Sequence, residues 1–160
     1  MTETLKITTP TDREAVLTRV FDAPAALVFD ALTNPELIRQ WSVPPGWSLV
    51  VCDVDLRVDG KWRFVSTKPD GRTVGQYGVY REIVPGERLV QTELWEDWDA
   101  GETLVTTVLS EQRGQTTFTS TIRFPSQEVR DTVLKHGLTS GAAGLYDRLA
   151  ELLMSALRAY

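Results

Sequence analysis

The sequence predicts an α+β domain in which a curved, seven-stranded antiparallel sheet wraps around a long C-terminal helix. Between residues 47 and 124, apolar and polar residues mostly alternate, which is the period of a half-buried strand. After residue 137, apolar residues recur every three or four positions, which is the period of a helix. A sheet with one charged face must bury its other face, and only the terminal helix is long enough to cover it.

The first strand is expected at residues 14–21, which are rich in β-branched and aromatic side chains. Pro24 suits the first turn of a helix, and the apolar residues at positions 25, 28, 29 and 32 form one helical stripe. A second start signal follows, with Asn34 as the cap and Pro35 at the first helical position. The sequence therefore predicts two short helices between the first and second strands, the second helix ending near Trp41.

Six further strands are expected in meander order. The prolines and the glycine of residues 42–46 predict a loop before them. The expected strands are residues 50–58, a strand around 61–64, and residues 74–84, 88–95, 104–111 and 116–124. In the strand at 50–58, the even positions from Val50 to Val58 are expected to form one apolar face. Gly60 breaks the pattern, and turn residues separate the later strands at 69–71, 85–87 and 112–115.

Two helices are expected after the last strand. Ser126 can cap a helix that runs to Lys135, and Gly137 follows in the position that ends helices. The terminal helix is the clearest signal in the chain, with an apolar stripe made by Leu138, Ala142, Leu145, Leu149, Leu152, Ala156 and Tyr160. A helix of about 20 residues is roughly 30 Å long, which is the width of a small domain.

Length and composition limit the functional classes. The 160 residues suit one domain, and we expect residues 1–12 to form a flexible N-terminal segment. With 17 basic and 22 acidic residues, the net charge of −5 argues against a nucleic-acid partner. No apolar run approaches the ~20 residues that cross a bilayer, and the lone Cys52 cannot form an intramolecular disulfide. We therefore expect a soluble cytoplasmic protein without membrane insertion.

Several segments together resemble a known superfamily. They are FDAP (21–24), TNPE (33–36), CDVDLR (52–57), GKWRF (60–64), PDG (69–71), GVYREIVPGERL (78–89) and YDRLAELL (146–153). Their order resembles the START-like, or SRPBCC, superfamily over residues 14–157, and it is most similar to the branch related to the activator of heat-shock-protein ATPase. This resemblance implies a helix-grip fold with an internal cavity between the sheet and the last helix. Members bind lipids, polyketides or plant hormones, and the branch implies a place in the stress response.

The chain departs from the family pattern at two places. Residues 41–44 read WSVP, where the family often has WWGP, and this segment lies at the expected mouth of the cavity. Asp59 and Gly60 stand where two glycines are common, a change that costs little because Asp tolerates turn conformations. The first departure leaves the type of ligand open.

The sequence contains almost no combination of residues that is typical of a catalytic site. His136 is the only histidine, and it is expected at the C-terminal end of a helix. There a positively charged imidazole is stabilised by the helix dipole, so we favour this role over catalytic proton transfer. Cys52 falls on the apolar phase of its strand, which favours packing over a nucleophilic role. The acidic loop at residues 96–102 lacks the ligand spacing of calcium loops. We predict no catalytic residue, no metal and no cofactor.

Aromatic residues indicate the candidate ligand site. Four of the five tryptophans lie at expected strand edges or in loops that should gather at one end of the curled sheet. Tyr80, His136 and Tyr146 are candidate polar anchors, and Gly141 is a place where the sheet or a ligand could approach the helix backbone. The predicted lining residues are Trp41, Trp62, Phe64, Tyr80, Trp95, Phe118, Ile122, His136, Gly141, Leu145 and Tyr146.

The leading hypothesis from the sequence is a module that binds a small hydrophobic molecule. One alternative is a cyclase or hydrolase acting on a substrate held in the cavity, because binding and orientation alone can accelerate a reaction. Another alternative is a chaperone partner that activates a heat-shock ATPase. The identity of the ligand and the formation of a homodimer stay open at this point.

Overall fold

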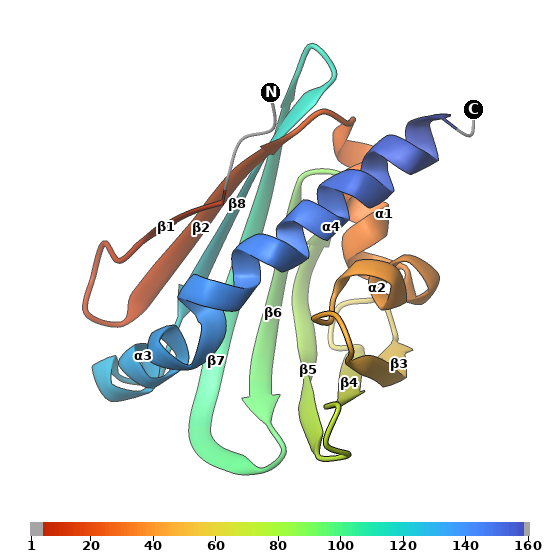
Figure 1. The fold of residues 1–160 in the computed structure, drawn as a ribbon. Coiled ribbons are helices and arrows are strands. Elements are labelled where there is room, and N and C mark those ends of the chain that lie inside the picture. Colours follow the sequence, from red (N-terminus) through yellow and green to blue (C-terminus); the bar gives the residue numbers. More distant parts are fainter. Residues whose placement is uncertain (1–4, 159–160) are drawn as a thin grey trace.

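The computed structural model describes residues 5–158, apart from the side chains of residues 137–140. Within this range one antiparallel sheet has the strand order β1-β2-β8-β7-β6-β5-β4-β3, and the long helix α4 crosses its concave face (Figure 1). The strands are β1 (Lys6–Thr8), β2 (Glu14–Phe21), β3 (Ser48–Val54), β4 (Lys61–Thr67), β5 (Thr73–Val84), β6 (Arg88–Trp95), β7 (Trp98–Gln112) and β8 (Gln115–Arg123). The helices are α1 (Ala25–Thr33), α2 (Pro35–Trp41), α3 (Gln127–Val133) and α4 (Thr139–Arg158), with a π-helical turn η1 at Leu134–Leu138.

The predicted helix-grip architecture is confirmed. β2 covers residues 14–21 as expected, and two short helices follow it. The Asn34 side chain accepts a hydrogen bond from the backbone N–H of Glu36 at 3.1 Å and so caps α2, with Pro35 at its first position. Strands β3 to β8 run in meander order, and β8 then pairs with β2, which adds β2 and β1 to that end of the meander and leaves β3 at the opposite edge of the sheet.

The sheet has one more strand than predicted. Lys6–Thr8 pairs antiparallel with β2, with Ile7 opposite Leu17. The expectation of a flexible segment over residues 1–12 is therefore wrong for this strand, while residues 1–4 lie outside the described residues. A three-residue strand is too short to show alternation in the sequence, but it covers the backbone edge that β2 would otherwise leave unpaired.

The strand expected at residues 50–58 ends at Val54. The chain then forms a turn in which the Arg57 N–H bonds the Asp55 carbonyl at 2.9 Å, and Asp59 adopts a positive φ of 66°. Leu56 and Val58 are exposed as a result, so they do not continue the apolar face. A register shift between Leu49 and Val51 also turns Val50 outward. A bulge and a turn, neither visible in the alternation, divide the predicted face.

Two other boundaries differ from the prediction. β7 begins at Trp98, so only Glu96 and Asp97 form the turn after β6, and the rest of the predicted acidic loop belongs to a strand. The helix expected up to Lys135 gives way to η1 after Val133. The π turn leads directly into α4, and Gly137 therefore does not end the helix. A π turn continues backbone hydrogen bonding with a wider spacing, which allows a change of direction without a break.

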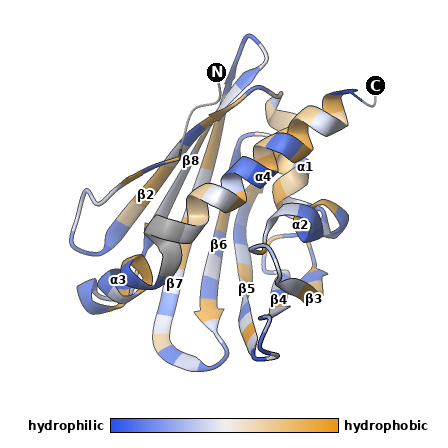
Figure 2. Ribbon diagram, in the orientation of Figure 1, coloured by the Kyte–Doolittle hydropathy of each residue, from blue (hydrophilic) through white to orange (hydrophobic). Residues whose placement is uncertain are grey.

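The core lies between the concave face of the sheet and α4. Leu17, Leu109 and Phe118 are buried on the sheet, and Leu149 and Leu153 of α4 belong to the same cluster. α4 also contacts α1 and α2, which close one end of the curved sheet (Figure 1). α1 is mostly hydrophobic, whereas α3 is mostly hydrophilic and has no buried residue (Figure 2). In the described part of the chain, no helix combines the length and apolar character needed to span a membrane.

Candidate functional site

Polar side chains gather on the concave face where β5 and β6 run side by side. Gln76 and Tyr80 come from β5, and Gln91 and Glu93 come from β6; we call these four residues the polar patch. Tyr80 lies directly opposite Gln91 in the ladder, and Glu93 lies opposite Thr103 of β7. The Gln76 side-chain amide donates a hydrogen bond of 2.9 Å to Glu93 Oε1. The patch is therefore built by the pairing of β5 with β6, and β7 borders it at Thr103.

The backbone hydrogen bonding between β5 and β6 is interrupted beside the patch. The Val79 N–H donates to the Thr92 hydroxyl at 3.0 Å instead of to a backbone carbonyl. The Thr92 carbonyl in turn accepts a hydrogen bond of 3.1 Å from Trp62 Nε1. The indole can reach this carbonyl across Gly78, because a Cβ there would lie 1.9 Å from the Thr92 oxygen. Trp62 thus forms a buried wall next to the patch and completes the hydrogen bonding of the opened ladder.

Glu93 is the charged group of the patch. Burial raises the pKa of its carboxyl from the ordinary 4.5 to about 7, and the hydrogen bond from Gln76 opposes this effect only in part. Protein surrounds Glu93 closely, yet part of its own surface is still accessible. Burial is therefore the main cause of the raised pKa.

Tyr146 faces the patch from α4. Burial raises the pKa of its hydroxyl, and the nearby negative charge of Glu93 raises it further. Burial also raises the pKa of the Tyr80 hydroxyl, with a smaller contribution from Cys52. Among the described residues, neither hydroxyl has a hydrogen-bond partner, and the same is true of the Gln91 side-chain amide. Of these three groups, the Tyr146 hydroxyl is the one whose pKa responds to the charge of Glu93, while Tyr80 and Gln91 lie opposite each other in the ladder between β5 and β6.

A row of aromatic rings crosses the interior beside the patch. The ring centroids of Trp41 and Tyr146 are 5.6 Å apart, and those of Tyr146 and Phe118 are 5.1 Å apart. Phe118 continues the row to Phe21 at 6.1 Å. The indole of Trp41 donates to the Ala31 carbonyl at 2.9 Å, which orients its ring. The row joins α2, α4, β8 and β2, so it lines the layer between the sheet and the helix.

The structure brings eight of the eleven predicted lining residues into this layer. Four are buried in the core cluster, namely Trp41, Trp62, Tyr80 and Phe118. Four more are partly buried and pack against that cluster, namely Phe64, Ile122, Leu145 and Tyr146. Trp95 lies opposite Gln76 in the ladder, with its ring centroid 6.2 Å from that of Trp98, at the end of the sheet where β6 turns into β7.

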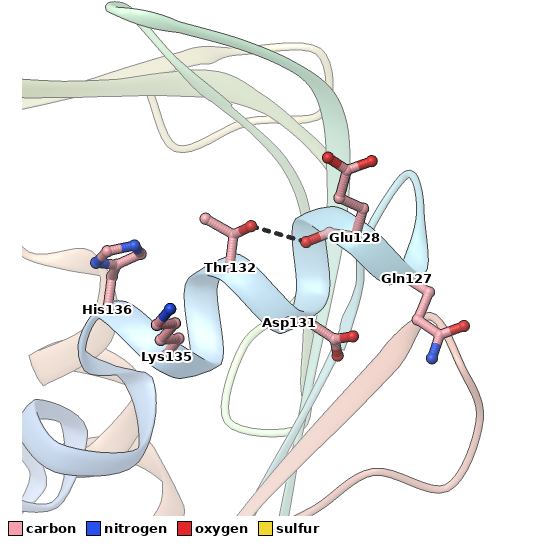
Figure 3. Close-up of a pocket in the computed structure, with 6 residues that line it drawn as sticks. All are labelled: Gln127, Glu128, Asp131, Thr132, Lys135 and His136. Atoms are coloured by element: carbon pink, nitrogen blue, oxygen red, sulfur yellow. Dashed lines mark hydrogen bonds between the residues drawn. The ribbon is translucent and has the colours of Figure 1, made fainter.

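His136 lies outside this layer, which corrects its placement as an inward anchor. It belongs to η1, and its side chain is exposed. It lines an open surface groove with five residues of α3 and η1, namely Gln127, Glu128, Asp131, Thr132 and Lys135 (Figure 3). Because the helix continues beyond it, His136 does not cap a helix end either. The groove residues come from one side of a single helical segment, and their charges are mixed.

Gly141 is also exposed, which corrects the expectation of a close approach to the helix backbone. No heavy atom of the described residues comes within 4 Å of a Cβ built at Gly141 or at Gly144, beyond the helix itself. These glycines face away from the buried side of α4, where Ala142 and Leu149 lie. The predicted apolar stripe is buried or partly buried from Ala142 to Ala156, and the glycines lie beside it; the Leu138 side chain and Tyr160 lie outside the described residues.

Sequence reasoning missed the polar patch except for Tyr80. The inward phase of β6 contains Gln91 and Glu93, and the outward phase contains Val90 and Leu94. Because the inward phase also holds Leu89 and Trp95, both faces of β6 carry apolar residues, and alternation does not identify the buried face. The signal that identifies the inward face is the ladder itself, because Leu89 and Gln91 lie opposite inward residues of β7.

A second buried charge on the concave face was also missed. Arg19 of β2 is only 2% exposed and forms an ion pair of 2.5 Å with Asp147 of α4. The guanidinium lies 5.3 Å from the centre of the Phe21 ring, and its Nε has no hydrogen-bond partner in the described structure. This pair ties the sheet to the helix on the far side of β7 and β8 from the patch.

Cys52 is buried, and its thiol pKa is raised mainly by burial, which fits the predicted packing role. Among the described residues, no three His, Cys, Asp or Glu side chains gather in a way that could hold a metal ion. The arrangement offers instead an apolar and aromatic layer with one carboxyl, two amides and two phenols directed into it. Such groups can orient an apolar molecule through hydrogen bonds.

Comparison with known proteins agrees with the fold. A family model described as "Activator of Hsp90 ATPase homolog 1-like protein" matches residues 22–154. A crystal structure of a Rhodobacter sphaeroides protein has 29% identity and a TM-score of 0.90, covering 96% of this chain and 99% of that chain. A crystal structure of a Nitrosomonas europaea protein has 27% identity and a TM-score of 0.85, covering 95% of this chain and 100% of that chain.

At 21% identity, the structure of CalU16 from Micromonospora echinospora shares the fold, with a TM-score of 0.65 over 99% of this chain and 89% of that chain. No curated protein sequence matches the chain. The family match spans most of the sequence and includes the strands of the polar patch and most of α4. The chain belongs to the activator of Hsp90 ATPase homolog 1-like family, within the START-like SRPBCC superfamily.

Proposed function

We propose that the protein binds a small hydrophobic molecule in an internal cavity between the concave face of the sheet and α4. The observation that carries this proposal is a set of inward-facing side chains that stay partly accessible in the middle of the molecule. Phe64, Val105 and Ile122 are examples from three different strands, and Leu145 and Tyr146 are examples from α4. Their neighbours at either end of the layer, such as Leu17 and Leu149, are no more than 2% exposed.

Packing density explains why partly accessible, inward-facing side chains support a cavity. Protein interiors are close-packed, so an inward-facing residue at the centre of a filled core retains almost no accessible surface. Partial accessibility at Val105 and Ile122, which lie opposite each other in the ladder between β7 and β8, supports a space above them. The walls of that space would be apolar and aromatic with a few polar groups, which is the usual composition of a small-molecule site. The fold of this family commonly binds hydrophobic ligands, which supports the same assignment.

The proposal is tested by filling the space from one strand of the sheet. Val105→Phe adds a ring on the concave face of β7, and Val108→Phe adds the same ring on the convex face of the same strand, where Val108 is 39% exposed. Wild type and both variants are heated with a panel of lipids and aromatic polyketides. A ligand that binds only the native state raises the melting temperature.

We expect at least one ligand class to stabilise wild type and Val108→Phe, and to have little effect on Val105→Phe. Native mass spectrometry of protein purified from its own host should identify a retained molecule of the same class. No shift for wild type across the whole panel, or an equal shift for both variants, would contradict binding above Val105.

A further inference from the structure

Building on the proposed binding function, we infer that the polar patch selects apolar ligands that carry a hydroxyl group and rejects ligands that carry a carboxylate or phosphate. The site would thus accept a phenol or an alcohol on an aromatic or alicyclic body, and it would disfavour fatty acids and phospholipids. Glu93 is the residue that makes this distinction, because it is the charged member of the patch.

The hydrogen bonds of Glu93 leave one acceptor position open. Its Oε1 accepts from Gln76, while Oε2 has no hydrogen-bond partner among the described residues. A ligand hydroxyl can donate to Oε2 and accept from a neighbouring group at the same time. The Tyr146 hydroxyl, whose pKa responds to the charge of Glu93, is a neighbouring donor, and the Gln91 amide belongs to the same face of β6 two residues before Glu93. The patch therefore matches a group that donates and accepts together, which an alcohol or phenol does.

The charge around Glu93 explains the rejection of anions. The residues that face it are Gln76 from β5, Thr103 from β7 and Tyr146 from α4, and in the described structure none of them is a cation. The buried cation of the concave face, Arg19, is on β2, beyond β7 and β8, and it is already paired with Asp147. An anionic head group at the patch would meet a second negative charge without compensation, which is unfavourable in a low-dielectric interior.

The protonation state of Glu93 gives the inference a second signature. Its pKa of about 7 means that the carboxyl is near half-ionised at neutral pH in the free protein. A ligand hydroxyl that donates to the carboxylate favours the ionised form, so binding should strengthen as the pH rises through 7. A ligand that only accepts hydrogen bonds favours the protonated carboxyl, and its binding should weaken over the same range. Tyr80 and Tyr146, with raised pKa values, stay neutral throughout.

Three probes with one apolar body test the inference: 2-naphthol, 2-methoxynaphthalene and 2-naphthoic acid. Their dissociation constants are measured by calorimetry or ligand-observed NMR at pH 6 and pH 8. A hydrogen bond to a charged acceptor in the interior corresponds to about a tenfold difference in affinity. We expect 2-naphthol to bind about tenfold tighter than either of the other probes at pH 8, and the preference over the methyl ether to shrink at pH 6.

Two variants and a control assign the effect to Glu93. Glu93→Gln keeps the shape and the hydrogen bonding of the side chain, and it should remove both the pH dependence and the rejection of 2-naphthoic acid. Glu93→Leu should also remove the preference for the hydroxyl. Glu102→Gln, on the exposed side of β7 next to Thr103, should behave like wild type. If Glu93→Leu does not fold, the probe series on wild type and Glu93→Gln still decides the question.

The possible outcomes separate the inference from the proposed function. Equal binding of all three probes, or tightest binding of 2-naphthoic acid, would overturn the selection by Glu93 and leave cavity binding intact. Failure of all three probes, together with no thermal shift from any lipid or polyketide, would overturn both.

Discussion

Replacing the buried carboxyl of Glu93 by an amide should stabilise the protein in a pH-dependent way. In the folded protein the pKa of Glu93 is about 7, against an ordinary value of 4.5. Between these values the folded state binds more protons than the unfolded state, so the free energy of unfolding falls as the pH rises. This loss of stability, which comes from ionising the buried carboxyl, is absent well below pH 4.5 and is complete above pH 7. Glu93→Gln removes it, because the amide stays neutral at every pH and can keep a hydrogen bond to Gln76.

The size of the effect follows from the two pKa values. They differ by roughly 2.5, and each unit corresponds to about 1.4 kcal/mol, which gives an upper value of about 3.4 kcal/mol above pH 7. Glu93 is only partly buried by accessible surface, and solvent screening reduces the loss of stability, so we expect a gain of about 2 kcal/mol at pH 8. At pH 4.5 the same substitution should change stability by less than about 0.5 kcal/mol.

Urea unfolding of wild type and Glu93→Gln at pH 4.5, 6 and 8 measures this difference. Glu102→Gln serves as the matched control, since Glu102 is exposed and its nearest cation, Arg81, is 3.8 Å away. The control should show no comparable pH-dependent gain. If Glu93→Gln is destabilising at pH 8, or if its effect is the same at all three pH values, then Glu93 is not held in a desolvated interior and the reasoning fails.

Two further predictions concern the groups that hold the layer together. Asp147→Ala leaves the Arg19 guanidinium buried without a counter-charge. Because the Asp147 side chain is 62% exposed, we expect the free energy of unfolding, measured in urea, to fall by only about 2 kcal/mol. Adding Arg19→Met should recover most of this loss. An equal loss in the single and double variants would show that the ion pair is not the cause. Gly78→Ala places a Cβ 1.9 Å from the Thr92 carbonyl oxygen and should lower the free energy of unfolding by about 3 kcal/mol. Gly144→Ala on the open side of α4 should instead stabilise by about 1 kcal/mol, and similar melting temperatures for the two alanine variants would contradict this account.

Features that depend on local chemistry were predicted well. The cap at Asn34 and the prolines before α1 and in α2 define two helices whose limits agree with the structure. The turn residues at 69–71 and 85–87 separate strands where expected. Aromatic residues on inward phases, such as Trp62 and Phe118, are buried as predicted. Each of these features is determined by neighbours within a few positions, which is the range that periodicity and capping rules describe.

Features that depend on pairing were predicted poorly. β1 exists because β2 has a free edge, and three residues carry no period of their own. The outward turn of Val50 comes from a register shift between β3 and β4. A π turn that contains His136 replaces the helix end that Gly137 suggested, and such a turn has no marker in this sequence.

By itself, the sequence determined the order of strands and helices, the apolar stripe of α4 and the aromatic character of the layer beneath it, because hydrophobic period and turn chemistry act over short distances. Only the tertiary structure decided which face of β6 looks inward, and so placed Glu93 among Gln76, Gln91, Tyr80 and Tyr146. Both faces of that strand carry apolar residues, and its pairing with β5 and β7 determines which face lies toward the interior. The environment of the carboxyl, and with it the chemistry of the candidate site, is a consequence of that pairing.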